Sequence, residues 1–222
     1  MARSDGIARF GALCAITAGL AFLAPLSFYF YFLPAAGSSA TLAQDPASFL
    51  PWMAGQGGVR VALWWMTCVP FLIALLGVPT TLKRRLKPAR PTAARTAELA
   101  GVLGFFTLLL ASLMLAAGEM PLAKAYVGAG TESRPAIVAV YEWQRLVTAL
   151  LFDVLGFFLL GVWVSLSSVA GLRSGRLPRW LGWFGVVTSV TIFAFVLGYL
   201  THIRWLGELG IGALAFATLP CL

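Results

Sequence analysis

One acidic residue, Asp153, lies deep within an apolar stretch, YEWQRLVTALLFDVLGFFLLGVW at 141–163. The nearest charged residue, Arg145, is about 12 Å away along a helix, which places Asp153 a third to half of the way into a bilayer. An acid near the centre of a membrane helix costs about 2.5–3.5 kcal/mol. Because no other apolar segment offers a basic residue at that depth, we expect Asp153 to be protonated, or bonded to a hydroxyl or backbone group.

Asp153 is expected to face protein, since lipid offers a carboxyl group no hydrogen-bond partner. Its helical neighbours Ala149 and Gly156 are small, so another backbone could approach closely there. Three roles remain open: a structural hydrogen bond, a contact with another subunit, and a proton or cation site on a transport path.

Further charged residues gather where the predicted helices end on one side of the membrane. Glu142 and Arg145 are three positions apart, and Arg204 and Glu208 are four apart, so both pairs could interact locally. The candidate residues of this outer cluster are Glu119, Glu142, Arg145, His202, Arg204 and Glu208. They could form an outward-facing polar vestibule, or simply a hydrated rim of charges.

The sequence gives little support to cofactor, metal or enzyme chemistry. A haem held by two histidines is excluded because His202 is the single histidine, and zinc sites need three or four ligands. Motifs such as HExxH, GxSxG and the Walker glycine loop do not occur. The cysteines Cys14, Cys68 and Cys221 lie far apart in apolar runs, where they act as packing residues. We therefore expect no cofactor and no metal.

The composition predicts an integral membrane protein. Hydrophobic residues make up 60% of the chain and charged residues 11%, against about 25% charged in soluble domains, and the mean hydropathy is +0.89. A membrane-spanning helix needs about 20 apolar residues. The apolar segments are 10–33, 61–82, 97–118, 144–170, 180–201 and 206–222. The prediction is an all-α, polytopic membrane protein with one six-helix bundle over 1–222, in which the first segment is a retained helix rather than a cleaved signal peptide.

The net charge of +8 is distributed as an orientation signal rather than as a nucleic-acid site. Eleven of the 16 basic residues fall on one side of the predicted bundle: Arg3, Arg9, Lys83, Arg84, Arg85, Lys87, Arg90, Arg95, Arg173, Arg176 and Arg179. The positive-inside rule then places both termini in the cytoplasm. The tract LKRRLKPAR at 82–90 is expected to determine topology and touch anionic lipid; a dedicated partner site is the alternative.

Two longer connections, 34–60 and 119–143, fall on the opposite side. Both contain prolines flanked by apolar residues. We expect short helices there that lie on the outer membrane surface, with Trp52 and Tyr126 at headgroup depth.

The string GRLPRWLGWFG at 175–185 opens the fifth predicted helix after a short basic loop. It resembles a motif of a family of uncharacterised bacterial six-helix membrane proteins, known as a domain of unknown function. The residues that carry the resemblance are Arg176, Pro178, Arg179, Trp180, Gly182 and Gly185. The resemblance implies six helices in a bacterial inner membrane and lends no functional residues.

For function, the leading hypothesis is a non-enzymatic accessory or scaffolding subunit of a larger inner-membrane complex, with lipid and other membrane subunits as partners. It rests on the missing cofactor and catalytic residues and on the abundant small and aromatic packing residues. The alternative is a small transporter or channel that uses Asp153 as an intramembrane proton or cation site. A third hypothesis is an intramembrane enzyme that uses the outer cluster.

Overall fold

The structure is a computed structural model that describes residues 37, 42, 45–87 and 91–203. All the regular elements in these residues are helices, and no strand occurs in this part. The elements are α4 (Pro46–Leu86), α5 (Pro91–Gly128), α6 (Arg134–Ala149), the π-helix η2 (Leu150–Gly156), α7 (Phe157–Ser174) and α8 (Arg179–Thr201). The predicted segments 10–33 and 206–222 lie outside the described residues.

Three stretches of the described chain are long and apolar enough to cross a membrane: Pro91–Gly128, Arg134–Ser174 and Arg179–Thr201. This finding confirms the all-α class and supports integration into a membrane. The predicted ranges 61–82, 97–118, 144–170 and 180–201 each lie within a described helix or helix run, and these helices are longer than the apolar ranges.

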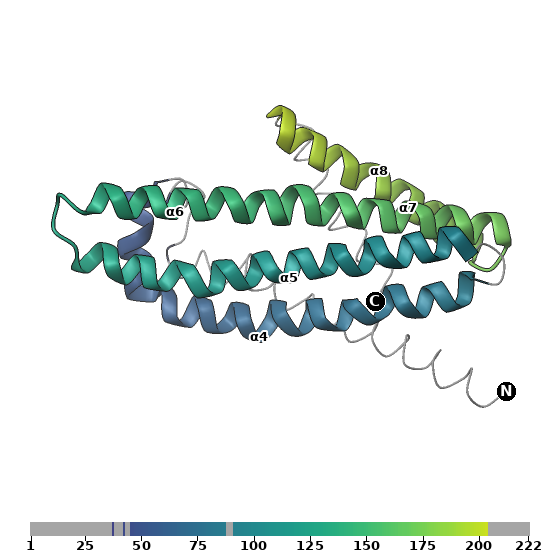
Figure 1. The fold of residues 1–222 in the computed structure, drawn as a ribbon, viewed down its shortest axis with the longest axis horizontal. Coiled ribbons are helices and arrows are strands. Elements are labelled where there is room, and N and C mark those ends of the chain that lie inside the picture. Colours follow the sequence, from purple (N-terminus) through teal and green to yellow (C-terminus); the bar gives the residue numbers. More distant parts are fainter. Residues whose placement is uncertain (1–36, 38–41, 43–44, 88–90, 204–222) are drawn as a thin grey trace.

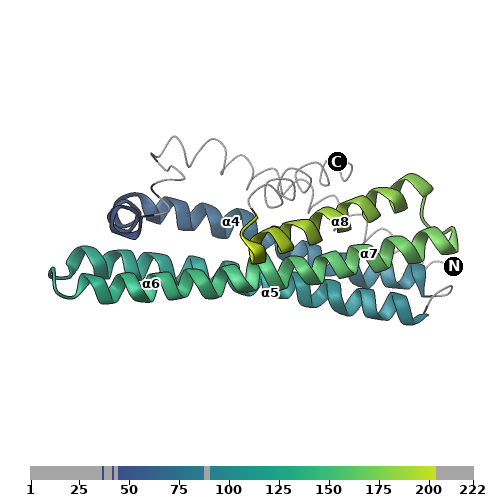
Figure 2. The ribbon, with the colours of Figure 1, turned by 90° about the horizontal axis from the view of Figure 1, so that it is seen from above.

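The long helices lie side by side (Figure 1). α6, η2 and α7 form one continuous rod that runs antiparallel to α5, and α4 packs along α5. α8 folds back against α7 and covers only part of the rod (Figure 2). The end of α4, the start of α5 and the turn between α7 and α8 meet at one end of the bundle, which we call the basic end. The turn between α5 and α6 lies at the opposite, far end.

The expectation of a loop with a short surface helix is wrong for the described part of 119–143, because α5 continues to Gly128 and α6 begins at Arg134, far past the apolar ranges. In 34–60, α4 begins at Pro46, and its first part runs across the far ends of α5 and α6 before the helix turns to lie along α5 (Figures 1 and 2). The prolines do not prevent this. A proline in the first turn of a helix, such as Pro46, removes no intrahelical bond, and the ring of Pro121 inside α5 is exposed, away from the packed face.

A small apolar core holds the far end together. It contains Phe49, Leu50, Met53, Ala123, Tyr126 and Tyr141, drawn from α4, α5 and α6. The rings of Phe49 and Tyr141 stack with centroids 5.7 Å apart. Tyr126 is buried in this core, with the Arg134 guanidinium 5.2 Å from its ring centroid. The Tyr126 ring therefore contacts protein, and its predicted depth in the membrane stays a prediction.

The first turn of α4 is capped by Asp45. Its carboxylate accepts hydrogen bonds from the Ser48 hydroxyl and from the Ala47 amide, the latter at 3.1 Å. The Ser48 hydroxyl and then the Ala47 amide hold the pKa of Asp45 below its ordinary value. The cap satisfies amide groups that the first turn leaves without an acceptor.

Close helix contacts in the middle of the bundle depend on glycine. A side chain at Gly101 would meet the ring of Pro79 at 2.7 Å and the indole of Trp163 at 2.8 Å. At the basic end, Leu86, Ala94 and Ala170 form a further buried cluster. Small residues therefore set the spacing of α4, α5 and α7, as is typical of membrane helices.

Candidate functional site

A polar hollow of about 280 Å³ lies between α5 and the run of α6 and η2. Its lining combines charged, hydroxyl and apolar side chains: Leu115, Glu119, Arg145, Thr148, Ala149, Phe152 and Asp153. The structure thus brings Asp153 together with Glu119 and Arg145, two members of the predicted outer cluster. A lone acid in the sequence becomes part of a group of three charged residues.

Contacts between the antiparallel helices show how the hollow is oriented. A Cβ atom added at Gly118 of α5 would overlap the side chain of Gln144 in α6, so these two positions face each other. Glu119 and Arg145, their neighbours in the chain, therefore lie at about the same level of the bundle. Asp153 lies about two turns nearer the basic end, about 12 Å along the helix. We therefore call the side of the hollow at Glu119 and Arg145, toward the far end of the bundle, its mouth, and the side at Asp153 its inner end.

A widened helical turn surrounds Asp153. The amide of Phe157 donates to the carbonyl of Phe152, five residues back, as in a π-helix. Such turns are rare and are frequent at functional sites. Because a helical side chain leans toward the start of its helix, the Asp153 carboxyl leans toward Arg145 and the mouth.

The wall above the widened turn is fixed by hydrogen bonds. The Thr148 hydroxyl donates to the carbonyls of Gln144 and Arg145, at 2.9 and 3.0 Å. The Gln144 side-chain amide donates across to the Met114 carbonyl of α5 at 2.8 Å. Since Gly118 has no side chain, Gln144 has the space to make this bond.

Asp153 is half-buried and forms no hydrogen bond or ion pair with another described residue. Tyr199 of α8 lies within electrostatic range of both Asp153 and Arg145, since Phe195, one turn earlier, contacts Phe157 with ring centroids 5.2 Å apart. The described lining holds two carboxyl groups, of Glu119 and Asp153, and one guanidinium, of Arg145.

An apolar cluster borders the hollow toward the basic end. Leu72, Phe105, Leu108 and Leu160 are its buried members, with Phe152 and Phe157 packed against it. The Phe152 and Phe157 rings meet edge to face with centroids 5.7 Å apart. Within the described residues, this cluster separates Asp153 from the basic end.

Two of the remaining predicted site residues, Glu142 and His202, do not line the hollow. Glu142 is exposed and forms no ion pair within the described chain, so the expected Glu142–Arg145 pair is not formed. The Arg145 guanidinium instead lies 5.8 Å from the centroid of the Tyr141 ring, where it gains an aromatic contact. His202 is exposed and ends α8 in a left-handed conformation, with φ 57°. Arg204 and Glu208 lie outside the described residues.

Residues 17–220 match the family described as a domain of unknown function, DUF4386. The chain belongs to this family. The match confirms the family resemblance inferred from 175–185. No curated protein and no solved structure matches the chain. The description of DUF4386 states no activity, so it assigns no role to the residues of the hollow.

Sequence reasoning missed two polar residues of this region, Thr148 and Tyr199. Thr148 shares the apolar run of Asp153, which was a usable signal, but Tyr199 comes from another helix and only the packing of α8 reveals it. Among the described residues, no group of three or more histidine, cysteine, aspartate or glutamate side chains could hold a metal ion.

Proposed function

We propose that this protein is a non-enzymatic, multi-pass transporter of the bacterial inner membrane that takes up a proton or small cation at Asp153. One observation carries the proposal: Glu119, Arg145 and Asp153 line a single hollow beside a widened helical turn. An acid held only for a structural hydrogen bond would need a fixed partner and no hollow.

The placement in the bilayer follows from the charges. By the positive-inside rule the basic end faces the cytoplasm. Glu98, paired with Lys83 at that end, is about 32 Å along α5 from Glu119, close to the 30 Å of a hydrocarbon core. The mouth of the hollow then opens at the outer surface, and Asp153 lies about 12 Å below it.

This arrangement gives each residue a role in binding. Glu119 at the mouth attracts a cation from the outer solution, and Asp153 binds it where the surrounding dielectric is low and the attraction is strong. Arg145 limits the net negative charge, so that the ligand can leave again. Passage inward requires the cluster of Phe152 and Phe157 to part, and the π-turn supplies a helix segment that can change register.

The test compares two substitutions of Asp153 with a control. Asp153→Asn keeps size and hydrogen bonding but cannot titrate, whereas Asp153→Leu also loses the hydrogen bonding. Glu142→Gln removes a carboxylate from the same helix run outside the hollow. Purified proteins are heated at several pH values and in sodium or methylammonium chloride, and uptake is followed in proteoliposomes. A ligand at 100 times its Kd stabilises the folded state by about 2.7 kcal/mol.

We expect Asp153→Asn to fold and to lose both the stabilisation and the uptake, with Glu142→Gln retaining them. If Asp153→Asn behaves as the parent protein and only Asp153→Leu is impaired, through lost assembly, the transporter is refuted and Asp153 is a structural or subunit contact.

A second candidate function, an accessory subunit of a larger complex, is favoured by a different observation. Val127 and Val140 lie on the far-end side of the mouth, and each is 53% exposed. In the proposed orientation they are outside the hydrocarbon core, where a partner subunit would remove them from water. Native purification tests it: co-migrating subunits that Val140→Glu releases, with uptake unchanged, would establish this function.

A further inference from the structure

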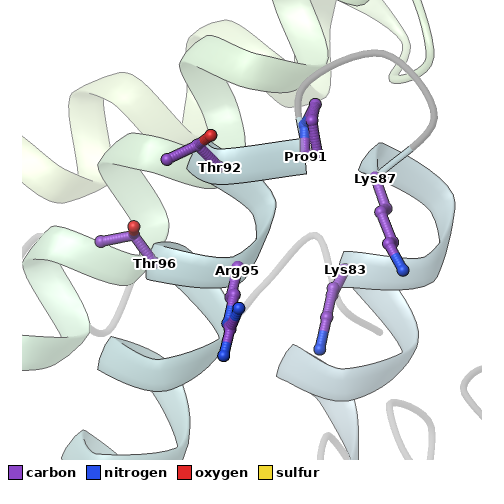
Figure 3. A pocket seen from close by; sticks show the side chains of 6 residues that line it. All are labelled: Lys83, Lys87, Pro91, Thr92, Arg95 and Thr96. Atoms are coloured by element: carbon purple, nitrogen blue, oxygen red, sulfur yellow. The ribbon is translucent and has the colours of Figure 1, made fainter.

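A second hollow, at the basic end, differs from the first in size and in charge. It lies between the end of α4 and the start of α5 and has a volume of about 530 Å³. Among the described residues, its lining holds basic and hydroxyl side chains and no acidic one: Lys83, Lys87, Pro91, Thr92, Arg95 and Thr96. Figure 3 shows the three basic side chains extending from the facing ends of the two helices.

The charges of this hollow are only partly balanced. Lys83 pairs with the Glu98 carboxylate, which ties α4 to α5. Lys87 and Arg95 make no ion pair with a described residue. Two cations that line one hollow attract an anion, although both side chains are exposed and salt screens this attraction.

The start of α5 adds hydrogen-bond donors that also favour an anion. Its first turn contains no acidic residue, and the amides of the first turn have no acceptor within the helix. The exposed Thr92 hydroxyl makes no hydrogen bond to the described chain. A helix start favours phosphate through its amides and its dipole, and the guanidinium of Arg95 can donate two parallel bonds to it.

We propose that this hollow binds a phosphate group, with Lys87 and Arg95 as the charged contacts and Thr92 as a hydroxyl donor. The site is distinct from the cation hollow and does not depend on the proposed transport. It lies where the apolar helices end, beside the buried Leu86 and Ala94. Headgroup phosphates of anionic lipids occur at this level of a membrane, and a soluble phosphate could reach the same donors.

The experiment uses the full-length protein in detergent and in nanodiscs. Native mass spectrometry and thermal unfolding measure binding of three probes: phosphatidylglycerol, phosphatidylcholine and inorganic phosphate. The test variant is the double substitution Lys87→Gln/Arg95→Gln, which leaves the Lys83–Glu98 pair intact. The matched control, Arg173→Gln/Arg176→Gln, removes the same charge from the same end, outside the hollow.

We expect the affinity of the parent protein for phosphatidylglycerol to exceed that for phosphatidylcholine, and the test variant to lose about tenfold or more of it. The control should stay within about twofold. Stabilisation by inorganic phosphate alone, lost in the test variant, would identify a soluble phosphate as the ligand; binding of the lipid alone would identify a headgroup.

A second variant distinguishes a loss of phosphate binding from a failure to fold. Thr92→Glu places a carboxylate in the first turn of α5, where it stabilises the helix but occupies the phosphate position. It should fold as well as the parent protein and bind phosphatidylglycerol about tenfold more weakly. Equal losses in the test and control variants, or full binding by Thr92→Glu, would overturn the proposal.

Discussion

The packing of α4, α5 and α7 can be tested at one glycine. In Gly101→Ala the new methyl group would lie 2.7 Å from the Pro79 ring and 2.8 Å from the Trp163 indole. Both neighbours are rings, which cannot yield by rotating a flexible end, so the helices must move apart. Overpacking of this kind costs about 1–3 kcal/mol.

The same substitution also has a favourable effect, because alanine is the better helix former by about 0.5–1 kcal/mol. Gly55→Ala provides the matched control, since a side chain at Gly55 of α4 has nothing within 4 Å. The helix-propensity gain is shared by both substitutions. The difference in unfolding free energy between them therefore measures the packing cost alone, about 1–3 kcal/mol.

The assay is unfolding in mixed micelles of dodecyl sulfate and a mild detergent, followed by circular dichroism. Gly55→Ala should be as stable as the parent protein or more stable, and Gly101→Ala should unfold at a lower dodecyl sulfate fraction. Equal stability of the two variants would refute the close approach of Pro79 and Trp163 to Gly101.

Three further predictions concern other parts of the chain. In a background without the natural cysteines, Glu132→Cys should react with an impermeant thiol reagent on intact cells and Arg176→Cys only after permeabilisation; the reverse pattern would invert the proposed topology. Gln144→Ala should cost about 1 kcal/mol in the same unfolding assay, because its hydrogen bond to α5 is lost. The lowered pKa of Asp45 means that its cap contributes fully above the ordinary value of 3.8 and is lost as the pH falls through the lowered value. Hydrogen exchange of the Ala47 amide, corrected for its intrinsic pH dependence, should show this loss in the parent protein and not in Asp45→Asn.

Within the described residues, hydropathy predicted the helices well and their ends poorly, for one physical reason. Apolar runs report where a helix crosses lipid, and the ranges 97–118 and 180–201 lie within α5 and α8 accordingly. A helix that continues into water becomes polar without ending. The extension of α5 past Pro121 to Gly128 is stabilised by packing against α4 and α6, which no local pattern contains.

For the cation hollow, the sequence identified individual residues but did not show that they line one site. Asp153 and its distance from Arg145 along one helix followed from the spacing alone. That the two line one hollow with Glu119 depends on the pairing of α5 with α6, and the π-turn at η2 depends on backbone hydrogen bonds that side-chain types do not encode. Asp153 forms no ion pair with a described residue, as expected from the lack of a basic residue at its depth in another apolar segment.

The basic residues illustrate how one set of charges can serve two purposes. Orientation in the membrane depends on the number of positive charges in the short loops and tolerates changes in their position. Phosphate binding depends on position, because Lys87 and Arg95 must line the same hollow at the start of α5. The variant Lys87→Gln/Arg95→Gln and the control Arg173→Gln/Arg176→Gln each remove two positive charges from the basic end. Both therefore weaken the orientation signal by the same amount. A difference in phosphate binding between these variants therefore cannot come from topology, and it separates a built site from a general excess of positive charge.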